Sequence, residues 1–189
     1  MDSENTFNIY REAESTITPN DFEKLCLELI QNSSNFSSIN DVIVQHDVIC
    51  KTPDGDYQLD GLIEFTLMNV RFKVIIECKR YKNKVKRELV AVLHSKMNSI
   101  GAQKGIMIST SGFQYGAVQY AKAHGIALIQ IIDKMWLTVQ ASALPSERLF
   151  DRYINMPDYV PVMYDLGLDF PLYQFPQLNG ELEKFLTTQ

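Results

Sequence analysis

The spacing of hydrophobic residues divides most of the chain into predicted helices and strands. Residues 18–21 favour a helix start, and apolar residues then recur at helical spacing: Phe22, Leu25, Cys26, Leu29 and Ile30. A strand is predicted at 42–50, and strong turn formers occupy 52–56. Two further β-prone runs, QLDGLIEF and FKVIIECKR, are separated only by TLMNVR. They are therefore predicted to pair as a hairpin.

The second half of the pattern predicts helices alternating with buried strands. A helix is expected over 85–100, with an apolar side made of Val85, Leu89, Val92, Leu93 and Met97. The apolar strand KGIMIST, a TSGF turn, a helix ending at Gly125 and the apolar strand IALIQII follow. Strands that are apolar on both faces indicate a parallel pair linked by a helix. The expected fold class is α/β, with a mixed central sheet flanked by helices.

The same pattern suggests how the chain is organised into domains. Residues 1–17 lack periodicity and are predicted to be a lead-in, and 18–140 form one domain. Residues 141–189 are rich in proline, aromatic and acidic residues, with a short closing helix near Glu181. We interpret this last part as a C-terminal extension that packs on the domain or on a partner.

Composition places the chain among globular proteins. It has 189 residues, of which 46% are hydrophobic and 22% charged. Cys26, Cys50 and Cys78 each lie in an apolar run and are predicted to be buried thiols. The first residues are acidic and polar, and no apolar run reaches the length of a membrane span. The expected location is therefore cytoplasmic, without a membrane partner.

The charge of the chain is strongly polarised. The net charge is -5, yet the segment 71–87 holds eight basic residues and one acid, so it carries +7 and the rest of the chain -12. A protein that presents one basic face to a polyanion has this distribution.

The predicted hairpin has a register that places two acids side by side. A turn centred on Met68-Asn69 sets Glu64 opposite Lys73, and Asp60 opposite Glu77. The other face is then uniformly apolar, with Ile63, Phe65, Val74, Ile76 and Cys78. A slip of one residue would spoil this division.

Opposed carboxylates are destabilising unless a cation or a proton lies between them, so the register predicts a metal site. Mg²⁺ prefers a few carboxylate oxygens plus water, and it can activate a water and polarise a phosphodiester. Lys79 lies two residues beyond Glu77 on the same face. Its two candidate roles are to orient or deprotonate the attacking water, or to stabilise charge on the phosphate.

The blocks QLDGLIEF, VIIECKRYKNKVKRELV and KGIMISTSGFQYGAVQYAKAHGIALIQI resemble the catalytic domain of Mrr-like restriction endonucleases, in the PD-(D/E)XK superfamily. The resemblance covers roughly residues 22–132. It implies Mg²⁺, or Mn²⁺ as a substitute, held by Asp60, Glu77 and the Cys78 carbonyl, with Lys79 as the catalytic lysine. Related nucleases often add an acid from the first helix, where Glu23 lies.

The chain departs from this family in the loop before the aspartate. The family often has a glycine-rich D-G-G-x-D, whereas this chain reads DGDYQLD over 54–60. Asp54 and Asp56 are therefore alternative ligands. Asp60 is preferred because it alone lies in register with Glu77.

Other polar residues have two interpretations each. Arg80, Lys82, Lys84, Lys86 and Arg87 form either a solvated face or a set of phosphate contacts, and their position after the site favours the contacts. Ser111 of the TSGF turn either caps the next helix, with Gly112 easing the bend, or contacts a phosphate, and the cap is favoured. His46, His94 and His124 show no ligand spacing and are expected to be structural or exposed.

These features together predict a Mg²⁺-dependent endonuclease that hydrolyses phosphodiester bonds in DNA, in restriction or antiviral defence. One alternative is a catalytically silent nuclease-fold module that binds nucleic acid or scaffolds a defence complex. Another is a nuclease resembling Holliday-junction resolvases. The expected partners are DNA and either a second copy of the chain or another protein bound through the C-terminal extension.

Overall fold

The computed structural model describes residues 17–32, 39–133, 159–164, 173–174 and 178–187. Within these ranges seven strands form one sheet, in which neighbours follow chain order from β1 to β7. The strands are β1 (Asn40–Thr52), β2 (Gly55–Leu67), β3 (Val70–Lys79), β4 (Lys104–Ser109), β5 (Ile126–Asp133), β6 (Tyr159–Tyr164) and β7 (Tyr173–Gln174). The helices of the same ranges are α1 (Pro19–Asn32), α2 (Arg87–Ile100), α3 (Tyr115–Ala123) and α6 (Leu178–Thr187).

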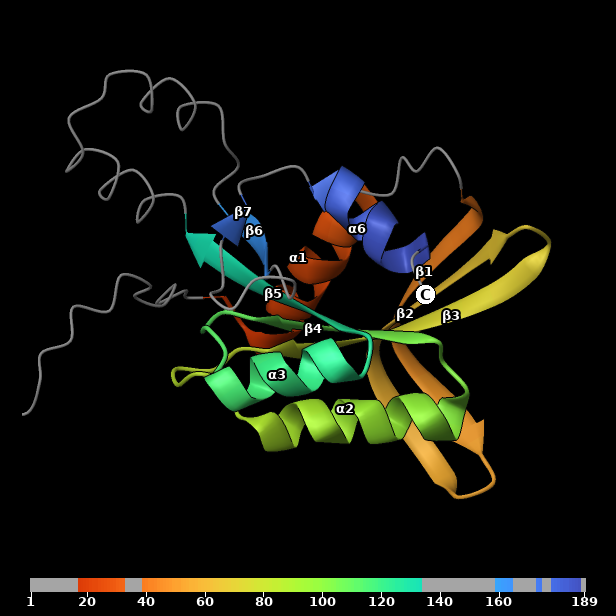
Figure 1. The fold of residues 1–189 in the computed structure, drawn as a ribbon, viewed down its shortest axis with the longest axis horizontal. Coiled ribbons are helices and arrows are strands. Elements are labelled where there is room, and N and C mark those ends of the chain that lie inside the picture. Colours follow the sequence, from red (N-terminus) through yellow and green to blue (C-terminus); the bar gives the residue numbers. More distant parts are fainter. Residues whose placement is uncertain (1–16, 33–38, 134–158, 165–172, 175–177, 188–189) are drawn as a thin grey trace, which may run out of the picture.

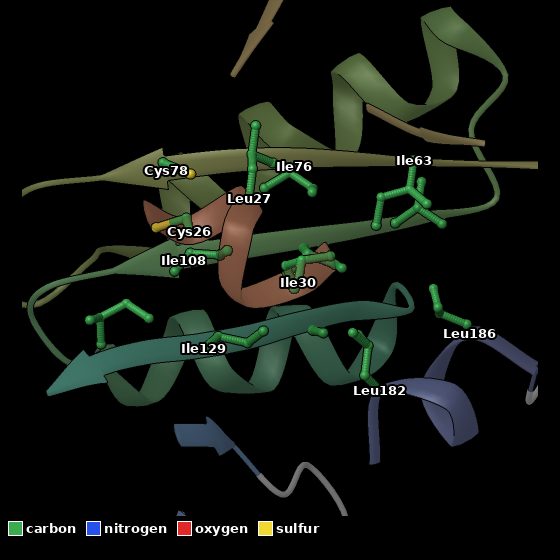
Figure 2. Packing of buried hydrophobic residues seen from close by; sticks show 14 of the residues in the cluster. Cys26, Leu27, Ile30, Ile63, Ile76, Cys78, Ile108, Ile129, Leu182 and Leu186 are labelled. Atoms are coloured by element: carbon green, nitrogen blue, oxygen red, sulfur yellow. The ribbon is translucent and has the colours of Figure 1, made fainter. Parts of the chain in front are cut away.

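The helices lie in two layers on either side of the sheet (Figure 1). Helices α1 and α6 cover one face, and their Phe22, Ile30 and Leu182 share a buried cluster with sheet residues. Figure 2 shows this cluster, in which Leu182 of α6 lies beside strand β5, the strand that carries Ile129. Helices α2 and α3 cover the other face and contribute Leu93 and Ala117 to a second cluster. None of the described helices is long and apolar enough to cross a membrane.

The sheet is mixed, as the sequence predicts. The pairs β3–β4 and β4–β5 are parallel, and all other neighbours are antiparallel. The parallel strands 104–109 and 126–133 are those expected from the apolar runs. Burial on both faces explains their composition.

The segment after residue 141 contributes to this sheet, which the hydrophobic pattern did not predict. Strand β6 pairs antiparallel with β5, and Val160, Val162 and Tyr164 are buried along it. Buried and partly buried residues alternate along β6, but the surrounding segment is rich in proline and aromatic residues. Pro161 is also a poor strand residue, so the sequence gives little sign of this strand. The predicted closing helix is α6.

The hairpin of β2 and β3 has the predicted turn and register. Met68 and Asn69 have φ values of 49° and 64°, and left-handed residues at both central positions define a type I′ turn. Glu64 pairs with Lys73 and Leu62 pairs with Ile75. The five residues predicted for the apolar face all lie in the cluster beneath α1. The ladder ends at Gly61–Ile76, one pair short of Asp60 and Glu77.

The first helix begins where the sequence predicts. The Asp21 backbone N–H donates to the Thr18 hydroxyl at 3.2 Å, and that hydroxyl donates to the Asp21 carboxylate at 2.7 Å. This reciprocal arrangement satisfies a free N–H at the helix start. Gly61 of β2 then allows α1 to approach closely, because a Cβ there would lie 2.5 Å from Cδ2 of Leu27.

Helix α2 differs from the prediction in its start and its apolar side. It begins at Arg87, and Val85 is a buried residue of the preceding loop that bridges to Phe113. Val90, Leu93 and Met97 are its buried residues, whereas Val92 is 54% exposed. Val90 and Val92 lie 200° apart on a helix, so only one can face the sheet.

Two of the three cysteines are buried as predicted, but Cys50 is only partly buried. All three are free thiols. Cys26 and Cys78 both lie in the cluster beneath α1 (Figure 2). A thiol hydrogen bond with Cys26, together with burial, raises the pKa of Cys78 well above its usual range, so this thiol is neutral.

Candidate active site

Glu77 and Lys79 form an ion pair at the end of β3. Lys79 Nζ donates to Glu77 Oε1 at 2.5 Å, and the two side chains are 20% and 12% exposed respectively. Residues two apart on a strand project from the same face, which brings them together. The Lys79 backbone is held in place because its carbonyl accepts from the Ser109 hydroxyl at 3.0 Å and from the Thr110 N–H at 3.1 Å.

A second lysine, which the sequence did not suggest, reaches the same carboxylate. Lys96 of α2 donates from Nζ to Glu77 Oε2 at 2.8 Å and to the Gln58 carbonyl at 3.3 Å. Each carboxylate oxygen of Glu77 therefore accepts from a different ammonium group. One sequence signal could have identified Lys96. It is a charged residue beside the apolar side of the predicted helix, which includes Leu93 and Met97.

Asp60 lies where the backbone pairing of β2 and β3 stops. Its Oδ2 accepts from the Cys78 N–H at 2.7 Å, so the side chain replaces the next ladder bond. The predicted backbone pairing of Asp60 with Glu77 is wrong in this respect. The Asp60 carboxylate is nevertheless bonded to the residue next to Glu77, and the charge of Glu77 acts on it.

Strand β2 is irregular at this point. Leu59 and Leu62 lie in the same buried cluster, although strict alternation would send residues three apart to opposite faces. On β1, Asp47 lies between the pairs His46–Gly61 and Val48–Leu59 and has a φ of 54°. Left-handed backbone is uncommon outside glycine, although aspartate adopts it more readily than most residues, and it clusters at functional positions. The distortion lies beside Asp60.

The charges of the site oppose one another. The pKa of Asp60 is raised overall. Burial and the charge of Glu77 raise it, and the hydrogen bond from the Cys78 N–H lowers it. Burial also raises the pKa of Glu77, but hydrogen bonds from Lys79 and Lys96 lower it overall. Burial lowers the pKa of Lys79. The hydrogen bond to Glu77 and the charges of Glu77 and Asp60 raise it, and the pKa is raised overall. Glu77 and Lys79 are thus a charged pair, and Asp60 is the acid with the least compensation.

These donors fit a hard divalent cation. The described residues place no donor on Asp60 Oδ1, and the Cys78 N–H and the charge of Lys79 compensate the carboxylate only in part, since its pKa is raised overall. Asp60, Glu77 and the Cys78 carbonyl are oxygen ligands of the kind Mg²⁺ takes together with water. No three or more His, Cys, Asp or Glu side chains in the described ranges group as a metal site.

Glu23 lies on α1 beside this centre but is directed to a histidine. Its Oε2 is 3.1 Å from His46 Nε2 of β1, and the two side chains are 27% and 30% exposed. Its charge contributes to raising the pKa of Asp60. His46, expected to be structural or exposed, is the partner of a candidate site residue.

The alternative acids lie in different surroundings. Asp54 accepts from the hydroxyls of Thr52, Tyr57 and Ser99, at 3.0 Å from Tyr57 and 2.8 Å from Ser99. These bonds join the β1–β2 turn to α2, which gives Asp54 a structural role. Asp56 is exposed and pairs with Lys51 along the backbone of that hairpin. Asp60 remains the better ligand because it alone has a bond to β3.

The TSGF turn braces the basic loop and does not cap a helix. Ser111 is 3% exposed, and its hydroxyl donates to the Asn83 carbonyl at 2.8 Å. Helix α3 begins after Gln114, which makes no side-chain cap bond. The predicted capping role of Ser111 is therefore wrong. Its burial also removes it from the phosphate contacts, because the hydroxyl is already used within the protein.

Three of the basic residues downstream of Lys79, Lys82, Lys84 and Lys86, line an open hollow. It has a volume of about 570 Å³ and is lined by one continuous stretch of chain: Tyr81, Lys82, Asn83, Lys84, Lys86, Glu88 and Leu89. All five predicted phosphate-contacting residues, Arg80, Lys82, Lys84, Lys86 and Arg87, are exposed. Bonds from Thr110 to the Tyr81 carbonyl and from Val85 to the Gly112 carbonyl hold this loop.

Comparison with protein families supplies a second line of evidence. The model of the restriction endonuclease family Mrr_cat matches residues 14–134, which is more than half of the chain. The chain belongs to this family. The Mrr_cat match begins before α1 and ends after β5, so it includes Asp60, Glu77, Lys79 and the basic loop. Membership implies a nuclease, which is a hydrolase.

Solved structures give weaker likenesses to this Mrr_cat protein. One is the crystal structure of the protein of unknown function AF1548, with a TM-score of 0.46, 14% identity, and coverage of 56% of this chain and 54% of the other. Another is that of protein VC1899 from Vibrio cholerae, with a TM-score of 0.44, 18% identity, and coverage of 58% and 29%. The chain thus spans about half of the first and under a third of the second. No curated protein matches it significantly.

Proposed function

We propose that this Mrr_cat protein is a divalent-metal-dependent endonuclease that hydrolyses phosphodiester bonds in DNA, with a role in restriction or antiviral defence. The observation that carries the proposal is the convergence of Asp60, Glu77 and Lys79 at one end of the β2–β3 hairpin. The defence role rests on the family alone.

Asp60 and Glu77, with the Cys78 carbonyl, would hold Mg²⁺, and Mn²⁺ as a substitute. The bound ion supplies Lewis-acid activation of a water and of the scissile phosphate. Burial lowers the pKa of Lys79, but ion pairing with Glu77 raises it overall, which favours the ammonium form in the metal-free protein. In that form it stabilises negative charge on the phosphate, the second of its candidate roles. Glu23 and its partner His46 would adjust the field around Asp60.

The basic loop would hold the DNA backbone beside this centre. Lys82, Lys84 and Lys86 line the hollow that begins two residues after Lys79. The net charge of the whole chain is -5, so attraction to phosphate depends on this local concentration of lysines. Bonds from the TSGF turn fix the loop relative to Lys79 and thereby fix the register of the DNA.

A plasmid-nicking assay tests the proposal. Supercoiled plasmid should be nicked with Mg²⁺ or Mn²⁺ and remain intact with EDTA. Lys79→Ala should lower the rate by a factor on the order of 10²–10³, the typical cost of losing a transition-state charge partner. Lys122→Ala, which changes an exposed lysine of α3, is the matched control and should keep full activity.

The same assay separates the alternatives. A silent binding module would shift DNA in a gel without nicking it, and a junction resolvase would cut branched DNA in preference to linear DNA. Full activity of purified Lys79→Ala would refute the assigned site.

A further inference from the structure

We infer that Lys96 is a second lysine of the active site, supplied by α2, which binds a phosphate oxygen of the nucleic acid once a divalent cation has taken over Glu77. The inference rests on the proposed function and extends it to a residue outside the two strands that carry the other groups.

The position of Lys96 supports a role beyond packing. Its side chain is 20% exposed, and its ammonium lies 2.8 Å from Glu77 Oε2. A single ion pair would neutralise Glu77, and Lys79 already provides it at 2.5 Å. Withdrawing another ammonium from water has a desolvation cost that a purely structural pair rarely repays. The second cation therefore calls for an explanation in the function of the site.

Charge counting gives that explanation. Asp60 and Glu77 carry two negative charges when ionised, and Lys79 and Lys96 carry two positive charges, so the four groups sum to zero without a metal. A divalent cation raises this sum to +2. The phosphodiester carries one negative charge, and attack by hydroxide brings it to two in the transition state. The four residues and the cation thus match the charge that develops on the substrate.

The geometry also shows how Lys96 would become available. A cation bound by Glu77 competes with the ammonium groups for the same two oxygens, so at least one lysine must release its bond. Lys96 reaches Glu77 from a separate element, α2, whereas Lys79 lies two residues away on the same strand and its backbone is held by Ser109 and Thr110. Helix α2 also begins directly after the basic loop, so one continuous stretch of chain carries both the exposed lysines of the loop and the Lys96 ammonium at Glu77.

The test compares Lys96→Met with Lys96→Arg, using Lys122→Met as the control. Binding of a fluorescent duplex oligonucleotide is measured in Ca²⁺ over a range of salt concentrations, and Mn²⁺ binding is measured separately by electron paramagnetic resonance. Loss of one phosphate contact lowers the slope of log affinity against log salt by about 0.9. We expect this change in Lys96→Met but not in Lys96→Arg or Lys122→Met.

The Mn²⁺ measurement distinguishes this role from a structural one. Removing a positive charge beside the site favours a cation, so Lys96→Met should bind Mn²⁺ at least as tightly as the wild type. A lysine that only holds Glu77 in place would give the reverse, with an unchanged salt slope and weaker Mn²⁺ binding. That result would overturn the inference.

Labelling of the wild-type protein keeps the inference testable if Lys96→Met fails to fold. Mass spectrometry after brief acetylation should show that Mn²⁺ increases modification of Lys96 and that added oligonucleotide then suppresses it. No response of Lys96 to either ligand would refute the inference. Failure of the proposed function is recognised separately, since wild-type protein would then neither nick plasmid nor bind the oligonucleotide.

Discussion

The Cys78 backbone N–H donates to the Asp60 carboxylate at 2.7 Å, just beyond Gly61 and Ile76, the last backbone pair of β2 and β3. A side chain thus takes the place of a ladder bond, and its acid is brought to the residues that flank Cys78. This single contact joins the hairpin geometry to the chemistry of Glu77 and Lys79.

Asp60→Asn should abolish plasmid nicking while raising the stability of the metal-free protein. Burial and the charge of Glu77 raise the pKa of Asp60, so its ionised form costs folding free energy near neutral pH. Asparagine can still accept from the Cys78 N–H but carries no charge. We expect the thermal midpoint in EDTA to rise by roughly 2–4 °C, equivalent to about 1 kcal/mol for a chain of this size. A lower midpoint would show that the charge of Asp60 stabilises the fold.

Glu23→Gln should weaken Mn²⁺ binding by a factor of about three to ten and slow nicking without abolishing it. The charge of Glu23 reaches Asp60, but its carboxylate is bonded to His46 and is not grouped with the two acids as a metal site. Glu28→Gln changes an exposed acid of the same helix and should have no effect. A complete loss of activity in Glu23→Gln would instead make Glu23 a direct ligand.

Leu93→Ala should destabilise the protein by about 2–5 kcal/mol, whereas Val92→Ala should change stability by less than about 0.5 kcal/mol. Leu93 is 1% exposed between α2 and the sheet, and Val92 is 54% exposed. Urea denaturation measures both. Equal losses would mean that α2 is rotated from its present orientation.

The Asp54 carboxyl should titrate near pH 2, as measured by nuclear magnetic resonance. Hydrogen bonds from Thr52, Ser99 and Tyr57 lower its pKa from 3.8 to about 2. Because the folded pKa is below the unfolded one, the stabilisation is complete above about pH 4 and is lost as the pH falls toward 2. Ser99→Ala removes one bond and should raise this pKa. An unchanged value would show that the turn is not joined to α2 in solution.

The periodicity of the chain was sufficient to predict several local features. Alternation over 58–79, with the apolar face of Ile63 and Ile76, led to the correct hairpin register, because a slip of one residue would have moved that whole face into water. Helical spacing located α1 and its start at Thr18. The spacing of Glu77 and Lys79 also placed both on one face, since strand geometry is local.

Other features depend on contacts between residues far apart in the sequence. Lys96 reaches Glu77 from another element, and no spacing within α2 indicates which strand residue it will meet. The sequence around Ser111 predicts a helix cap, yet its hydroxyl donates to the Asn83 carbonyl of the distant basic loop. Val92 and Val90 are equally apolar, and the packing of α2 on the sheet determines which is buried. Local periodicity sets which residues share a face, whereas the docking of elements sets what each face meets.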